Sequence, residues 1–83
     1  MAHDHETSTS FMKLRKKVGL TQRQVADALG VTTTTISSWE TGIKEPRLDF
    51  LQTRLLMELY QCSIDELAKA LEELRAQKNR TSS

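Results

Sequence analysis

Six hydroxyl side chains between positions 32 and 38 are the group in this chain best suited to chemistry with a partner molecule. Four consecutive threonines, Thr32 to Thr35, are followed after Ile36 by Ser37 and Ser38. A hydroxyl donates or accepts single hydrogen bonds and a threonine methyl packs on other methyl groups, so such a segment can contact the base edges of DNA. Threonine is a poor helix former, so four in a row on a helix require a reason. The alternative is an ordinary solvated helix face.

Groups suited to catalysis or metal binding are sparse. His3 and His5 flank Asp4 in the polar segment 1–9 and lack a fixed third ligand. Cys62 is the single cysteine, which favours a reducing cytoplasm and a small gap in the core, with a redox switch as the alternative. No Ser/His/Asp, Cys/His or paired-carboxylate arrangement is supported. We therefore expect no enzyme activity, no metal and no cofactor.

Two short helices are predicted on either side of Gly30. Thr21 and Gln24 form a capping box that begins a helix over residues 21–29, and Gly30 ends it. After Val31, Thr32 caps a second helix over residues 32–40. The apolar residues expected to face the core are Val25, Ala26, Leu29, Ile36 and Trp39. The alternative for Trp39 is that it stacks on a DNA base. Two helices joined by so short a turn form a helix-turn-helix.

Three further helices complete an all-α prediction with no sheet. The first begins at Ser10 and ends at Gly19, the fourth begins at a cap formed by Asp49, and the fifth begins at a capping box formed by Ser63 with Glu66. Their inward apolar residues are expected to be Phe11, Leu14 and Val18; Leu51, Leu55, Leu56 and Leu59; and Ile64, Leu67, Ala68, Leu71 and Leu74. Residues 1–9 are predicted to be a disordered polar tail, 10–78 the domain, and 79–83 a frayed tail.

The net charge of +1 is unevenly distributed along the chain. Residues 11–48 carry seven basic and three acidic side chains, a net charge of +4, whereas residues 49–74 carry two basic and six acidic ones, a net charge of −4. A basic half beside an acidic half suits a polyanionic partner. No apolar run exceeds three residues, so no membrane span is expected, and the polar start of the chain is unlike a signal peptide.

The sequence LTQRQVADALGVT at residues 20–32, followed by ISSWETG at 36–42 and then Pro46, resembles the lambda-repressor-like (Cro/repressor-type) helix-turn-helix family. The resemblance extends from about Leu14 to Leu71. It implies a five-helix DNA-binding domain in which residues 21–29 form the positioning helix and residues 32–40 form the recognition helix, which enters the major groove.

The resemblance also implies which residues contact DNA. Family members place a glutamine of the positioning helix against a phosphate, and the backbone amides at a helix start favour an anion. The implied set is Gln22 with Arg23 for phosphate; Thr33, Thr34 and Ser38 for base edges, with Thr32 and Ser37 beside them; and Thr41, Gly42 and Lys44 for the backbone beyond. The recognition helix offers no exposed Arg, Asn or Gln for bidentate reading of a base, so we expect modest direct readout supplemented by DNA shape and two half-sites.

Basic residues of the first helix have competing interpretations. The resemblance pairs Arg15 with Glu40 in an internal ion pair, the alternative being that Arg15 reaches a phosphate. Removing one partner of a buried pair costs roughly 3–5 kcal/mol. Lys13, Lys16 and Lys17 either contact phosphate or form a solvated face.

The resulting functional prediction is a cytoplasmic, sequence-specific transcriptional regulator that binds double-stranded DNA as a homodimer. Two recognition helices would lie about 34 Å apart. The fifth helix is longer than the core requires, and Ala70, Leu71 and Leu74 are predicted at its dimer interface, unless Leu74 continues the core stripe. No small-molecule ligand is expected. The alternative function is a protein-interaction adaptor or antitoxin component with the same fold, suggested by the weak recognition side chains and the acidic segment 49–74.

Overall fold

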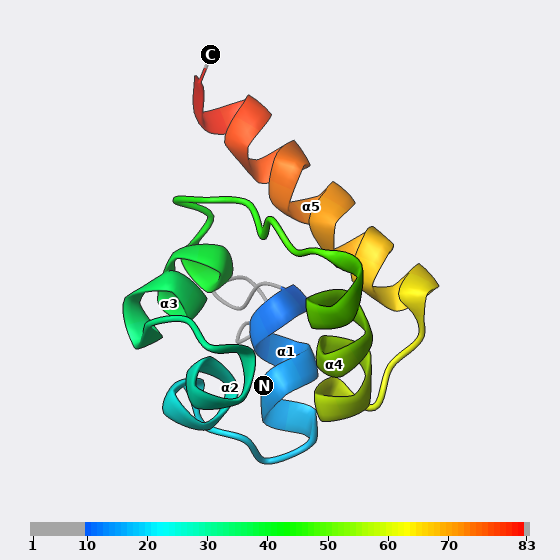
Figure 1. Ribbon diagram of the computed structural model, residues 1–83. Helices are drawn as coiled ribbons and strands as arrows, with labels where there is room; N and C mark the ends of the chain where they lie inside the picture. The colour runs from blue at the N-terminus through cyan, green and yellow to red at the C-terminus, as the bar shows by residue number, and fades with distance from the viewer. Residues whose placement is uncertain (1–9, 83) are drawn as a thin grey trace, which may run out of the picture.

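The computed structural model describes residues 10–82, with side chains described as far as residue 76. This part of the chain forms five helices and no strand, which confirms the all-α prediction (Figure 1). The helices are α1 (Ser10–Lys17), α2 (Gln22–Leu29), α3 (Thr33–Thr41), α4 (Phe50–Tyr60) and α5 (Ile64–Ser82). The predicted tail over residues 1–9, including His3 and His5, lies outside the described residues. Helix α5 continues past residue 78, where the ordered domain was predicted to end.

Helix α1 occupies the centre of the bundle. It packs against α3, α4 and α5, while α2 packs against α3 and α4. Figure 1 shows α2 and α3 together on one side of α1, α4 on the other side, and the C-terminal part of α5 extending beyond the other helices. The Ser10 hydroxyl also hydrogen-bonds the Glu73 carboxylate, which ties the start of α1 to α5.

Side-chain caps begin the helices at the predicted positions. Thr21 Oγ1 accepts a hydrogen bond from the Gln24 backbone N–H at 3.1 Å, and Gln24 Oε1 accepts from the Thr21 N–H at 2.9 Å. The same reciprocal pair is formed by Asp49 with Gln52 and by Ser63 with Glu66. Each pair satisfies two backbone N–H groups at a helix start, one on the cap residue and one on the third helical residue, because the helix itself supplies no acceptor there.

Gly30 reverses the chain between α2 and α3. Its φ of 75° lies in the left-handed region that glycine adopts without a steric cost, and its N–H donates to the Ala26 carbonyl. The Val31 N–H donates to the same carbonyl at 3.0 Å. Gly42, with φ of 85°, ends α3 in the same conformation. The helix end predicted at Gly30 is thus confirmed.

Buried apolar side chains from all five helices form a single core among the described residues. Its most buried members are Phe11, Val25, Ala26, Leu29, Ile36, Trp39, Leu56, Tyr60, Leu67, Ala70 and Leu74. The predicted core residues Leu14, Leu55 and Leu59 are partly buried and pack against this cluster. Sequence reasoning did not anticipate Tyr60, which is fully buried at the end of α4.

Helix α5 is rotated about its axis relative to the prediction. Ala70 and Leu74, predicted at a dimer interface, are buried in the core at 2% and 1% exposure, so that interface is wrong. Leu67, Ala70 and Leu74 follow one another three and four residues apart and define the inner face. Ile64 and Ala68, predicted to face inward, are exposed, and Leu71 lies between the two faces.

Helix α4 also places its apolar residues differently from the prediction. Leu51 is 67% exposed, and its neighbour Phe50 is 94% exposed. The buried positions are Leu56 and Tyr60, four residues apart on one face of the helix. Six of the residues from Phe50 to Tyr60 are large and apolar, so periodicity alone did not identify the inner face.

Candidate nucleic-acid interface

The first turn of α3 projects two threonines into solvent from a rigid base. The inner side of α3 is held by buried Ile36 and Trp39, which pack in the core with residues of α2. Thr33 and Thr34, the first two residues of α3, are exposed. None of the hydrogen bonds described in the structure uses their hydroxyl groups. Both side chains therefore present a hydroxyl and a methyl group to solvent, where they can contact another molecule.

Two other threonines of the run serve the helix itself. Thr32 Oγ1 accepts the backbone N–H of Thr35 at 3.1 Å and lies 2.9 Å from the Thr35 hydroxyl oxygen. This hydrogen bond caps the helix as predicted. A base contact by Thr32 would compete with the cap, so the hydroxyls of the run divide into two that hold the helix and two that face outward.

Ser38 lies on the inner side of α3. It is 8% exposed, which leaves little of the side chain to reach a base edge as the resemblance implied. Its carbonyl oxygen instead accepts backbone N–H groups from the three residues that follow Thr41: Gly42, Ile43 and Lys44. Ser38 therefore shapes the loop after α3, while Ser37, half-buried, lies nearer the surface.

The C-terminal end of α3 and the next residues present a mixed surface. The Thr41 hydroxyl donates to the Ser37 carbonyl at 2.9 Å, so its proton is already engaged. Gly42 is half-buried, whereas Ile43 and Lys44 are exposed. Lys44 is therefore the member of this predicted group with a positive charge free to approach a phosphate.

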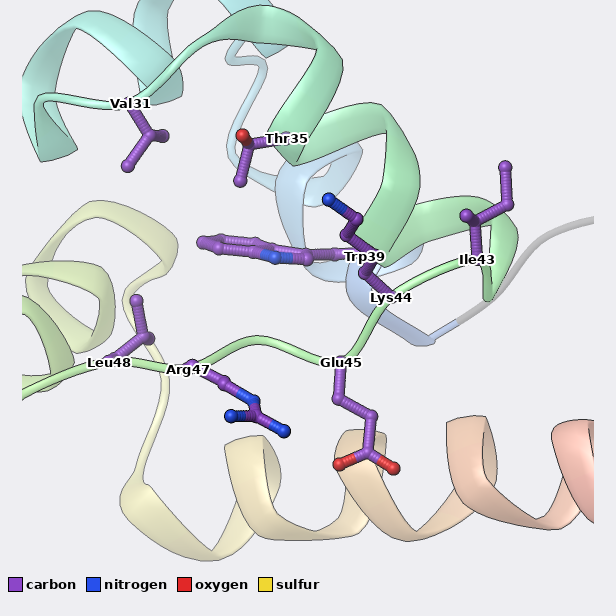
Figure 2. Close-up of a pocket in the computed structure, with 8 residues that line it drawn as sticks. All are labelled: Val31, Thr35, Trp39, Ile43, Lys44, Glu45, Arg47 and Leu48. Atoms are coloured by element: carbon purple, nitrogen blue, oxygen red, sulfur yellow. The ribbon is translucent and has the colours of Figure 1, made fainter.

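Figure 2 shows the loop over residues 42–48 running past one face of the Trp39 ring. A groove of about 580 Å³ is lined by Trp39 together with loop residues that include Ile43 and Leu48. Trp39 is buried, so the prediction that it packs in the core rather than stacking on a base is confirmed. Arg47 and Glu45 project toward α5, and the Glu45 carboxylate lies 3.3 Å from Arg75 Nε. Both partners are partly solvated, so this ion pair orients the loop at little gain in stability.

Arg15 of α1 and Glu40 of α3 form the predicted internal ion pair. Arg15 Nε and Nη2 donate to the two carboxylate oxygens of Glu40 at 2.6 and 3.0 Å, and Nη1 donates to the Leu20 carbonyl at 2.9 Å. Glu40 is 1% exposed and Arg15 is also buried. The hydrogen bond to Glu40 raises the pKa of Arg15, although burial acts in the opposite direction. The structural interpretation of Arg15 is thus confirmed.

Gln22 joins this pair through a contact that sequence reasoning missed. Its side-chain amide donates to Glu40 Oε1 at 2.9 Å, although the two residues are eighteen positions apart. Gln22 is the first residue of α2 and is half-buried, whereas its neighbour Arg23 is exposed. The Arg23 guanidinium lies 3.9 Å from Asp27 with both side chains largely solvated, so it stays available to a phosphate. No local sequence pattern predicts the contact between Gln22 and Glu40.

Three lysines and one thiol were the other candidate groups in the sequence. Lys13, Lys16 and Lys17 are exposed on α1. Burial, followed by the charge of Glu66, raises the pKa of the half-buried Cys62 thiol, which disfavours the reactive thiolate. Among residues 10–82, no three His, Cys, Asp or Glu side chains gather closely enough to hold a metal ion. Within the same range, no helix combines the length and apolar character that crossing a membrane requires.

Comparison with known proteins identifies the family. A family model described as helix-turn-helix matches residues 11–67, which include α1 to α4 and the start of α5. No match was found among curated proteins or among solved structures. The matched region contains the two capped helices, the tight turn at Gly30 and the buried Arg15–Glu40 pair. The chain belongs to the lambda-repressor-like helix-turn-helix family of DNA-binding regulatory domains.

Proposed function

We propose that this protein is a sequence-specific transcriptional regulator that places α3 in the major groove of double-stranded DNA. The observation that carries the proposal is the exposure of Thr33 and Thr34 at the start of a helix whose other side is locked into the core. Gln22 and Arg23 at the start of α2, and Lys44 after α3, would contact the flanking phosphates. Phosphate contacts fix the register of the domain, and base contacts supply the sequence preference.

The direct readout in this proposal is limited to single hydrogen bonds and methyl contacts. Thr33 and Thr34 each provide one hydroxyl and one methyl group, and the methyl group can pack on a thymine methyl. The half-buried Ser37 is a secondary contact. Shape and deformability of the site would then contribute a large share of the specificity.

We further propose that the protein binds DNA as a homodimer, because two half-sites raise the specificity of weak individual readers. Burial of Ala70 and Leu74 means that any interface uses another surface. The exposed Ile64 and Ala68 of α5 line an apolar groove of about 260 Å³, and Pro46 is another of its lining residues. This groove is the surface of α5 best suited to contact with a second copy.

The test is DNA binding as a function of salt, using duplexes selected from a random pool. Each neutralised phosphate contributes about −0.9 to the slope of log K against log salt. Lys44→Ala should weaken binding on all sequences and reduce the magnitude of the slope by about 1. Lys69→Ala, an exposed lysine on α5, is the matched control and should change neither quantity. Absence of duplex binding, or affinity independent of salt, would refute the proposal.

A second candidate function is a protein-interaction adaptor or antitoxin component. The observation that favours it is the exposure of adjacent Phe50 and Leu51 on the first turn of α4. Exposed apolar side chains grouped together are typical of protein contact sites. Binding of a partner protein through such a surface would persist at high salt, so the same salt series separates the two functions.

A further inference from the structure

Glu40 is a buried acceptor at which three helices meet. It receives hydrogen bonds from Arg15 on α1 and from Gln22 on α2, while it belongs to α3. We propose that Glu40 is a positioning residue for DNA binding, because it orients the Gln22 side chain so that Gln22 donates a hydrogen bond to a DNA phosphate. This inference rests on the proposed function and identifies the internal support of one of its phosphate contacts.

The carboxylate determines which way the Gln22 amide turns. An ionised carboxylate only accepts hydrogen bonds, so the amide must present its NH₂ group to Glu40 rather than its carbonyl oxygen. Glu40 Oε1 takes one of the two hydrogens at 2.9 Å. The second hydrogen points elsewhere, and a phosphate oxygen, which also only accepts, is a suitable partner for it. Gln22 can therefore bridge the buried carboxylate and a phosphate.

The position of Gln22 suits a phosphate contact. The first backbone hydrogen bond of α2 runs from the Val25 N–H to the Thr21 carbonyl, and the Thr21 hydroxyl takes the Gln24 N–H. The backbone N–H groups of Gln22 and Arg23 have no acceptor within the helix. A phosphate at this end would receive those N–H groups together with the Gln22 side chain.

Orientation before binding increases affinity because the side chain loses less freedom when the complex forms. An immobilised flexible side chain costs an interface part of its affinity. Gln22 is already held in the free protein, so its side chain loses conformational freedom when the protein folds and not when DNA binds. If Glu40 served only to neutralise Arg15, the contribution of Gln22 to DNA affinity would be the same with or without Glu40.

A double-mutant cycle distinguishes these two roles. Gln22→Ala is measured in the parent chain and in a background carrying Arg15→Met with Glu40→Leu, which removes the whole ion pair and strands no charge. Circular dichroism establishes that each variant is folded, and fluorescence anisotropy gives its affinity for a selected duplex. Gln22→Ala should lower affinity about tenfold in the parent, as for a hydrogen bond to a charged group, and less than threefold in the background.

Lys44→Ala provides the matched control in the same cycle. Among the described residues, the hydrogen bonds and ion pairs of Arg15 and Glu40 do not involve Lys44, so the loss of affinity on Lys44→Ala should be equal in both backgrounds. Equal losses for Gln22→Ala in both backgrounds would overturn the inference, as would a Lys44 effect that also disappears. A parent chain that binds no duplex would overturn the proposed function and this inference with it.

NMR of the intact chain tests the inference without replacing the ion pair. The two side-chain amide protons of Gln22 are followed while a duplex is added to the labelled protein. We expect the proton bonded to Glu40 to keep its resonance position and the other proton to shift as a phosphate accepts it. If both protons keep their positions, or both lose their separate resonances, the orientation mechanism is wrong.

Discussion

Replacing Glu40 by leucine should destabilise this domain severely, because the substitution strands a buried guanidinium. Arg15 would lose both hydrogen bonds to the carboxylate and keep only the one to the Leu20 carbonyl. Removing one partner of a buried ion pair costs about 3–5 kcal/mol. Domains of this size are stable by roughly 5–15 kcal/mol, so the loss is a large fraction of the total.

Urea denaturation followed by circular dichroism measures this loss. With an m-value of about 1 kcal/mol/M, at the low end for small proteins, the midpoint should fall by about 3 M or more. Replacing both partners, Arg15→Met with Glu40→Leu, should restore most of the stability, because no charge is then left buried. The double variant should lie within about 1 kcal/mol of the parent chain.

The coupling between the two substitutions is the decisive quantity. If the destabilisation by Glu40→Leu and that by Arg15→Met simply add in the double variant, the two side chains do not depend on each other. Additive losses, or a loss below about 1 kcal/mol for Glu40→Leu alone, would refute the reasoning. If Glu40→Leu costs less stability than expected, water must solvate Arg15 in spite of its burial.

Base recognition, dimerisation and the buried Tyr60 hydroxyl can each be tested with substitutions. Thr34→Ala should relax preference at one base position by roughly 1 kcal/mol without changing the salt slope, measured by anisotropy on duplexes with single base changes; unchanged preference and affinity would remove Thr34 from the recognition surface. Ala68→Glu should convert the dimer to a monomer, which sedimentation measures as a lower mass, either in the free protein or in its DNA complex. Ala28→Glu, at an exposed alanine of α2, is the control and should leave the mass unchanged. If the dimer survives Ala68→Glu, the two copies pair through another surface. Burial, followed by the charge of Glu40, raises the pKa of Tyr60 far above its ordinary value of 10.0, so its contribution to stability is complete below pH 10 and is lost as the pH rises further. Between pH 8 and 11, the urea midpoint of Tyr60→Phe should therefore decline less than that of the parent. Both proteins carry Cys62→Ala, so that the thiol titrates in neither. Equal declines in the two proteins would contradict the role given to Tyr60.

The helix boundaries follow from interactions within a few residues of the chain. Thr21 with Gln24 and Asp49 with Gln52 satisfy backbone N–H groups across a single turn, so their effect does not depend on the rest of the fold. Gly30 likewise ends α2 because it adopts a left-handed conformation at low cost. The helix-turn-helix was therefore predictable from the sequence, and so was the family to which it belongs.

The rotation of each helix in the bundle depends on the tertiary structure. On α5, apolar residues occupy two adjacent faces, and either face satisfies the helical period. Docking against α1 selected Ala70 and Leu74 for the core and left Ile64 and Ala68 exposed. Similarly, Leu51 matched the period of α4 but lies outside its contacts with the other helices.

The candidate site shows the same division between local and tertiary causes. Thr33 and Thr34 directly follow the Thr32 cap and are exposed in the first turn of α3, ahead of the residues by which this helix packs in the core. The contact between Gln22 and Glu40 arises only when α2, α3 and α1 pack together, because the two residues lie far apart in the chain. The sequence by itself determined where the helices begin and which residue types they carry. Packing determined which of those residues meet, because that depends on contacts between helices that no local pattern specifies.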